Sequence, residues 1–259
     1  MNHLRSFLWT AAPGLFFVAI LLVWELSVLI FEPPNYLLPA PSEIWAAGRK
    51  VEGALWLAHI WATVRVALTG FGIAILISIP LAAAVALSPV MSRTVYPLLV
   101  VVQSTPIVAV APIIVVALGA GDLPRIVITA MISFFPLVVA TSTGLLATPG
   151  ELIELSRSLR PPRGREVTQI RLMFAVPYIF SALKISITLA VIGAVVAEFV
   201  AAENGLGYFI LFSTSFFKVP QAFAALGVLV ALSLAMFQAV NLAQHLLFPW
   251  SLHTADKGS

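Results

Sequence analysis

The sequence contains few charged residues and no cysteine. Charged residues make up 10% of its 259 residues and hydrophobic residues 61%, whereas soluble domains have roughly 25% and 45–50%. This composition excludes a soluble protein and predicts a chain that lies in lipid. The absence of cysteine excludes a disulfide framework, a thiolate metal site and a cysteine nucleophile.

Residues that membrane enzymes and ATPases require are also scarce or missing. The histidines are not at metal-ligand spacing, and the only aspartates, Asp122 and Asp256, are far apart. Neither a Gly-x-Ser-x-Gly motif nor a Gly-x-x-x-x-Gly-Lys-Ser/Thr phosphate loop occurs. We therefore expect no metal site, no cofactor and no catalytic residue in this chain.

Long apolar runs occupy most of the chain. A helix needs roughly 20 residues to cross the bilayer, and six runs are long enough: 13–31, 60–88, 95–118, 126–146, 177–200 and 223–247. We therefore predict an all-α fold, a polytopic bundle of about six transmembrane helices. A short turn is expected at 89–94. Polar residues 35–58 are expected to form an extracytoplasmic interfacial segment, with Ser42 as the N-cap of a short helix.

The basic residues near the ends of these runs are unevenly divided. If the N-terminus is inside, the arginines of residues 154–173 lie on the same side of the membrane as both termini. Because Lys and Arg are enriched in cytoplasmic loops, we predict that both termini and the polar loop 148–175 are cytoplasmic. The same bias explains the net positive charge, so nucleic acid is not an expected partner.

The polar loop between the fourth and fifth runs is the candidate functional segment. Leu152, Leu155 and Leu159 recur at i, i+3 and i+7, which predicts an amphipathic helix. Such a helix can dock in a groove on a partner protein, or it can lie on anionic lipid beside the loop's arginines. The residues alone leave both interpretations open.

The order of residues in this loop resembles the EAA loop of ABC importer permeases, which forms the helix that couples to the ATPase. The positions that correspond to the Glu-small-small triplet and its followers are Glu154, Leu155, Ser156, Arg157, Ser158 and Leu159. Two positions depart from the pattern, because Arg160 stands in place of the usual glycine and Met173 in place of the usual proline. The resemblance implies that residues 154–160 couple to the ATPase.

Other short motifs resemble the nitrate, sulfonate and taurine branch of these permeases. They lie between about residues 39 and 250 and are Pro41 to Trp45, Gln103 to Pro106, Ser133 to Pro136, Pro177 to Ile185, Glu198-Phe199 and Gly205-Leu206-Gly207. Within that branch, residues 103–106 and 191–196 are similar to permeases assigned to thiamine or riboflavin precursors. The resemblance implies the type I ABC importer permease fold.

The resemblance also implies a set of partners. They are a second copy of this chain, two cytoplasmic ATPase subunits that bind ATP and Mg²⁺, and an extracytoplasmic solute-binding protein, at a bacterial inner membrane. Residues 1–58 would form an N-terminal transmembrane helix and the interfacial segment, 59–250 the permease core and 251–259 a tail. The expected solute is small and organic, either a vitamin precursor such as a pyrimidine or flavin, or an anion such as a sulfonate. The alternative is a secondary transporter or channel without an ATPase.

Polar residues inside the third run are the first candidates for the translocation pathway. Gln103, Ser104 and Thr105 precede Pro106, which frees a backbone carbonyl. Polar groups in lipid are costly unless they are satisfied or face water. Ser104 and Thr105 have the alternative of bonding back to their own helix, but Gln103 does not.

Glu198 in the fifth run is the second pathway candidate. An intramembrane acid is a functional candidate by default. The alternative is that it reaches the interface or pairs with Arg125 or Lys218. These pathway candidates carry no fixed positive charge, which suits a neutral heteroaromatic solute at least as well as a sulfonate.

Overall fold

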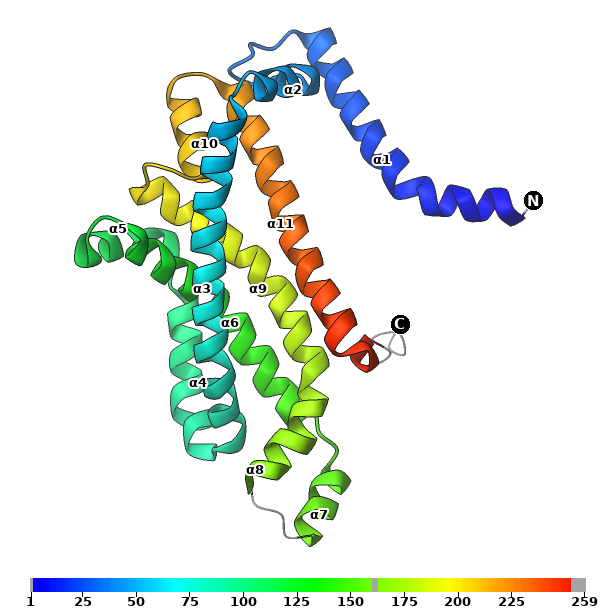
Figure 1. Cartoon of the computed structure of the whole chain (residues 1–259), viewed down its shortest axis with the longest axis vertical. Helices are drawn as coiled ribbons and strands as arrows, with labels where there is room; N and C mark the ends of the chain where they lie inside the picture. The colour runs from blue at the N-terminus through cyan, green and yellow to red at the C-terminus, as the bar shows by residue number, and fades with distance from the viewer. Residues whose placement is uncertain (1, 160–162, 253–259) are drawn as a thin grey trace.

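The computed structural model describes residues 2–159 and 163–252, with the side chains of residues 12–159 and 164–252. This part of the chain folds into helices and connecting turns without a strand (Figure 1). In chain order the elements are α1 (Asn2–Phe31), α2 (Pro41–Arg49), α3 (Gly53–Leu87), α4 (Pro89–Ser104), α5 (Ile107–Leu118), α6 (Asp122–Leu146), α7 (Gly150–Ser158), α8 (Arg163–Arg165), the π-helix η1 (Glu166–Arg171), α9 (Leu172–Ala201), α10 (Leu206–Ser215), α11 (Val219–Leu247) and the 3₁₀ helix η2 (Pro249–Leu252).

The predicted number of membrane crossings is confirmed. Five stretches of helix among the described residues are long and apolar enough to cross a bilayer: Ala12–Phe31, α3, Glu166–Ala201, α6 and α11. The pair α4 and α5 makes a sixth if the two are counted as one broken span. The all-α bundle of about six transmembrane helices is therefore present.

The centre of the bundle is formed by α6 and α9, which pack along one another, and by α3, which lies against both. Small residues allow the close approach. A Cβ added at Gly70 on α3 would lie 2.6 Å from the Thr129 side chain of α6, and one at Gly193 on α9 would lie 2.9 Å from the Thr129 Cα. Glycines at such crossings are typical of membrane helix packing, which depends on close van der Waals contact.

The first helix lies apart from this centre. Figure 1 shows α1 diverging from the bundle. It contacts α2, and an edge-to-face contact between Trp24 and Phe223 joins it to α11. The predicted N-cap role of Ser42 is wrong, because α2 begins at Pro41 and its N-cap is Ala40, two residues before Ser42. Proline suits the first position of a helix. Ser42 instead donates its hydroxyl hydrogen to Glu25 Oε1 over 2.6 Å, which ties α2 to α1.

Three of the predicted turns and span boundaries differ from the structure, each at a proline. The expected turn at 89–94 is helical, since Pro89 opens α4 and the Ser88 hydroxyl accepts a hydrogen bond from the Met91 amide. The third run is not one straight span, because it bends by 94° between α4 and α5. The fifth span begins before Pro177, which is accommodated inside α9, as membrane helices can accommodate proline.

Candidate functional site

The amphipathic helix predicted in the polar loop is present as α7. It lies at one end of the bundle, opposite to the end that carries α2 and α10 (Figure 1). We call these the α7 end and the α10 end. Leu152 and Leu155 are 38% and 59% exposed, whereas Ser156 is buried. Glu154 is exposed. An open apolar face beside an exposed carboxylate is a surface suited to docking.

The remaining residues of the predicted coupling set lie at the C-terminal end of α7 or just after it. Arg157 and Ser158 are exposed in the last turn of α7, and the Ser158 hydroxyl donates to the Glu154 carbonyl over 3.0 Å. Leu159 is exposed at the C-cap. Arg160 lies outside the described residues, so its predicted role stays a prediction, as does coupling to an ATPase.

Two charged side chains of η1, Glu166 and Arg171, connect this element to α7 and to α6. Glu166 Oε1 accepts hydrogen bonds from Arg171 Nε at 3.0 Å and Nη2 at 2.8 Å, and Glu166 Oε2 lies 3.6 Å from Arg157 Nε on α7. Arg171 is only 8% exposed, and its Nη1 donates to the Leu145 carbonyl of α6 over 3.5 Å. We call Glu166, Arg171 and Arg157 the Glu166 clamp. From the sequence, Arg157 was predicted to belong to the coupling segment, whereas Glu166 and Arg171 were predicted only to lie in the polar loop 148–175.

At the predicted pathway motif, the third span breaks. Ser104 Oγ donates to the Val100 carbonyl at 2.8 Å and Thr105 Oγ1 to the Val101 carbonyl at 3.2 Å, so both hydroxyls bond back to α4. Gln103 is exposed and has no partner among the described residues. The bend follows from Pro106, which has no amide hydrogen to continue the helix. The pathway role of these residues stays a prediction.

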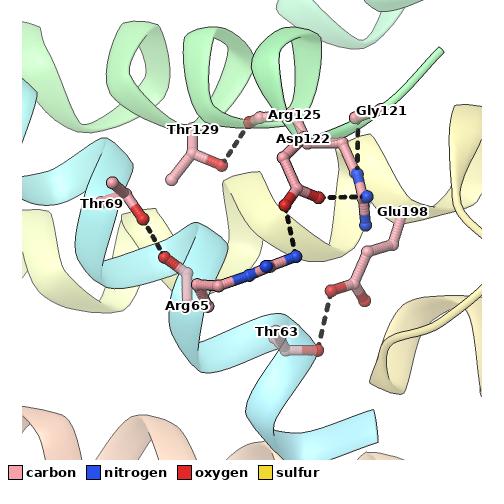
Figure 2. A network of polar contacts seen from close by, with 8 residues as sticks. All are labelled: Thr63, Arg65, Thr69, Gly121, Asp122, Arg125, Thr129 and Glu198. Carbon is pink, nitrogen blue, oxygen red and sulfur yellow. Dashed lines mark hydrogen bonds and ion pairs between the residues drawn. The ribbon is translucent and has the colours of Figure 1, made fainter.

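At the α10 end, Glu198 is 1% exposed, and its carboxyl group is held by its own bundle (Figure 2). Glu198 Oε1 accepts from the Thr63 hydroxyl of α3 at 2.8 Å, and Oε2 accepts from the Gly207 amide at 2.7 Å. No ion pair of Glu198 occurs within the residues that the structure describes. Its role in the pathway stays a prediction, but its contacts already assign it a structural one.

Thr63 and one further side chain, His59, complete this arrangement. Thr63 Oγ1 accepts the Leu206 amide at 2.9 Å, and His59 Nδ1 accepts the Gly205 amide at 3.1 Å. Three successive amides at the start of α10, which its own helix cannot satisfy, are therefore each bound by a buried side chain. We call His59, Thr63 and Glu198 the α10 cap.

The two glycines whose amides the α10 cap binds, Gly205 and Gly207, have no room for a side chain. A Cβ at Gly205 would lie 2.2 Å from Glu198 Cδ, and Gly205 has φ +131°. A Cβ at Gly207 would lie 2.9 Å from Glu198 Oε2. These glycines shape the turn into α10, as their place in the sequence motif suggests.

Charged residues beside the α10 cap pair with one another. Figure 2 shows the Asp122 carboxylate between Arg65 of α3 and Arg125 of α6, forming an ion pair with each. Arg125 Nε also donates to the Gly121 carbonyl over 3.0 Å. Of the two ion-pair partners predicted as alternatives for Glu198, Arg125 is thus directed to Asp122, and Lys218 forms no ion pair with a described residue.

One cation that the sequence did not lead us to predict as a functional residue lies inside a span. Lys184 lies in the middle of α9, is half-buried, and has no hydrogen bond or ion pair with a described residue. An unpaired charge in hydrocarbon is costly and marks a functional candidate. A lysine within an otherwise apolar run is a signal that the sequence already contains.

The chain has clear relatives. Residues 74–250 match the family model described as binding-protein-dependent transport system inner membrane component. The formylaminopyrimidine transport permease protein ThiX of Halalkalibacterium halodurans is 32% identical over 238 residues, which cover 92% of this chain and 95% of that protein. The riboflavin transport system permease protein RibX of Chloroflexus aurantiacus is 32% identical over 255 residues, covering 96% and 94%.

A solved structure has the same fold. A chain of the MetNI methionine ABC transporter, in an inward-facing conformation, superposes with a TM-score of 0.65 at 21% identity. The match covers 74% of this chain and 95% of that one. The part of this chain that matches thus includes nearly the whole of the MetNI chain's fold.

Proposed function

The chain belongs to the family of binding-protein-dependent transport system inner membrane components, and on that premise we propose how it works with its partners. It is a multi-pass inner-membrane permease of an ABC importer with the type I fold, as the sequence predicts. Members of this family are transport subunits, not enzymes. We propose that ATP and Mg²⁺ are bound, and ATP hydrolysed, by separate ATPase subunits.

The observation that carries the proposal is α7, an amphipathic helix whose leucines are exposed at one end of the bundle. We propose that α7 docks in a groove on the ATPase, with Leu155 entering the groove and Glu154 at its rim. Docking would cover the apolar face that the single chain leaves in water. One ATPase copy per permease copy, and two permease copies per importer, complete the proposed assembly.

This assignment orients the molecule. The α7 end and both termini would be cytoplasmic, which agrees with the arginines around α7. The α10 end would face the solute-binding protein. Residues 1–58 would then form the peripheral first helix and the extracytoplasmic segment, 59–250 the permease core, and 251–259 the tail.

We propose that the translocation pathway lies between two copies of the chain. The break at Gln103 to Pro106 supports this placement, because an exposed amide side chain beside a broken helix needs water or a partner in the membrane. Lys184 joins these candidates, since an unpaired ammonium group is tolerated where it faces a hydrated route. Glu198 is buried in the α10 cap and would stabilise the helices around this route without facing it.

For the solute, we propose a small heteroaromatic vitamin precursor. The support is that ThiX and RibX, named for a formylaminopyrimidine and for riboflavin, match almost the whole chain. A sulfonate is the second candidate. The putative aliphatic sulfonates transport permease protein SsuC of Bacillus subtilis matches at 26% identity over 60% of this chain, and Lys184 would suit an anionic group.

The experiment that tests the coupling proposal is co-purification with the ATPase encoded nearby. Leu155→Glu and Glu154→Arg should abolish the complex, because they place charge in the groove or reverse it at the rim. Glu52→Arg is the control, since Glu52 is an exposed glutamate at the α10 end. A complex that survives both α7 variants, or the absence of any ATPase partner, would favour a secondary transporter or channel instead.

A further inference from the structure

We propose that the Glu166 clamp is the joint through which movement of α7 reaches the membrane spans, and that Glu166 and Arg171 are positioning residues for ATP-driven transport. This inference rests on the proposed docking of α7 on an ATPase. It concerns the other side of α7, where the helix meets its own chain.

The packing of α7 leaves few routes for force. In the described part of the chain, α7 packs against η1, the π-helix that runs directly into α9. Its other connections are covalent, through residues 147–149 to α6 and through the chain that follows Leu159. A helix tethered at its two ends alone would swing on these links without moving the spans. The contact with η1 is therefore the place where a displacement of α7 is transmitted to the bundle.

Glu166 has the chemistry that this contact needs. One oxygen of its carboxylate accepts two hydrogen bonds from Arg171, at 2.8 and 3.0 Å. The other oxygen forms an ion pair with Arg157 of α7 at 3.6 Å. The Glu166 side chain is 14% exposed and that of Arg157 is 68% exposed. The clamp thus has a buried half, in which two donors on the Arg171 guanidinium fix the orientation of the Glu166 carboxylate. Its water-exposed half is the ion pair with Arg157 on α7.

Arg171 extends the clamp to a second span. Its Nη1 donates to the Leu145 carbonyl in the last turn of α6, where helix carbonyls lack partners and the helix dipole favours a cation. The ends of α6 and α9 are consequently joined through one guanidinium. These are the two spans that flank α7 in sequence and form the centre of the bundle.

The π-helix explains why the pair can form. In an α-helix, residues three or four apart face one another, whereas Glu166 and Arg171 are five apart. The wider turn of η1, with hydrogen bonds between residues i and i+5, brings them to one side. The clamp and the π-helix therefore depend on each other, and a return of η1 to α-helical winding would separate the carboxylate from the guanidinium.

The test uses the complete importer in lipid vesicles, with a readout that needs no knowledge of the solute. The chain has no cysteine, so Leu123→Cys, at the exposed start of α6 on the α10 end, places one spin label in each copy. The distance between the two labels is measured without nucleotide and with ATP, Mg²⁺ and vanadate. Binding of the ATPase is measured separately by co-purification.

We expect Glu166→Gln to keep the ATPase bound but to lose the nucleotide-induced change in label distance. Arg157→Gln, which spares the buried pair, should reduce the shifted population about threefold, as suits an exposed ion pair. The exchange Glu166→Arg with Arg171→Glu should restore part of the change. Glu151→Gln, on the exposed first turn of α7, is the matched control and should behave as the unmodified chain.

Each failure has a distinct meaning. If the unmodified chain binds no ATPase, the proposed function fails. If it binds and responds, and Arg157→Gln and Glu166→Gln respond equally well, the clamp proposal is overturned. Should Glu166→Gln not fold, Glu166→Asp takes its place, because it keeps the charge and shortens the reach. A normal response from Glu166→Asp together with Arg157→Gln overturns the proposal in the same way.

Discussion

The two ends of α9 are held by different chemistry. At the α10 end, His59, Thr63 and Glu198 bind three successive backbone amides from buried positions. At the α7 end, the Glu166 clamp joins side chains to one another through charge, and one partner is largely in water. Hydrogen bonds to amides demand fixed geometry, whereas an exposed ion pair keeps most of its modest energy over a range of distances. We infer that α9 is anchored at one end and adjustable at the other.

The largest effect should come from filling the space at Gly205. Gly205→Ala places a Cβ 2.2 Å from Glu198 Cδ and should destabilise the chain by about 3 kcal/mol or more, from overpacking and backbone strain. Gly121→Ala is a close control, because Gly121 has φ +133° against +131° but nothing within 4 Å. Thermal unfolding of the purified protein in detergent should separate the two. Equal stability of both variants would contradict a rigid α10 cap.

The next effect should come from the carboxyl of the α10 cap. Glu198→Ala removes the acceptor of the Gly207 amide and leaves the Thr63 hydroxyl with only the His59 carbonyl, at 3.3 Å. It should cost about 2–4 kcal/mol, because two buried donors lose a partner. Combined with Gly205→Ala, it should cost less than the sum of the single changes, because the clash is gone. Thermal unfolding of the two single variants and the double variant measures this coupling. Simple additivity would mean that the two positions are independent.

A smaller effect is expected at Thr63. Thr63→Val removes a hydroxyl that donates to Glu198 and accepts from Leu206, and should cost about 1–2 kcal/mol. Thr63→Ser keeps the hydroxyl and should recover most of that. Thr69→Val is the control, since Thr69 is exposed and bonds only its own helix. A loss in Thr69→Val as large as in Thr63→Val would show that the hydroxyl's partners are irrelevant.

The smallest effect on stability is expected at the α7 end. Arg157→Gln should change the free energy of unfolding by less than about 0.5 kcal/mol, because exposed ion pairs contribute little. The same variant should nevertheless weaken coupling, as proposed above. Thermal unfolding beside the spin-label measurement compares the two quantities. A stability loss comparable to that of Thr63→Val would erase the contrast between an anchored and an adjustable end.

Features set by local sequence could be predicted, and features set by distant contacts could not. Apolar runs predict the spans, and the spacing of Leu152, Leu155 and Leu159 predicts α7, because each pattern is complete within one helix. Glu198 was recognisable as an intramembrane acid, but its partner Thr63 lies 135 residues away in the sequence. No local rule joins these two positions.

Two further features were hidden by the assumption of regular α-helix. Glu166 and Arg171 fall on different sides of an α-helix and meet only in a π-helix. The sequence predicts one span over residues 95–118 with Pro106 inside it, because apolar residues continue on both sides of the proline. The bend of 94° shows that an apolar run does not guarantee a single helix.

That bend has a consequence for hydration. With 16 residues, α4 is about 24 Å long, and with 12 residues α5 is about 18 Å long, so neither alone crosses a hydrocarbon layer of about 30 Å. The third crossing therefore stops inside the layer, and backbone groups near Thr105 and Pro106 must meet water there or a second protein surface. The length of α4 therefore determines the depth in the membrane at which water or a second protein surface must reach the backbone.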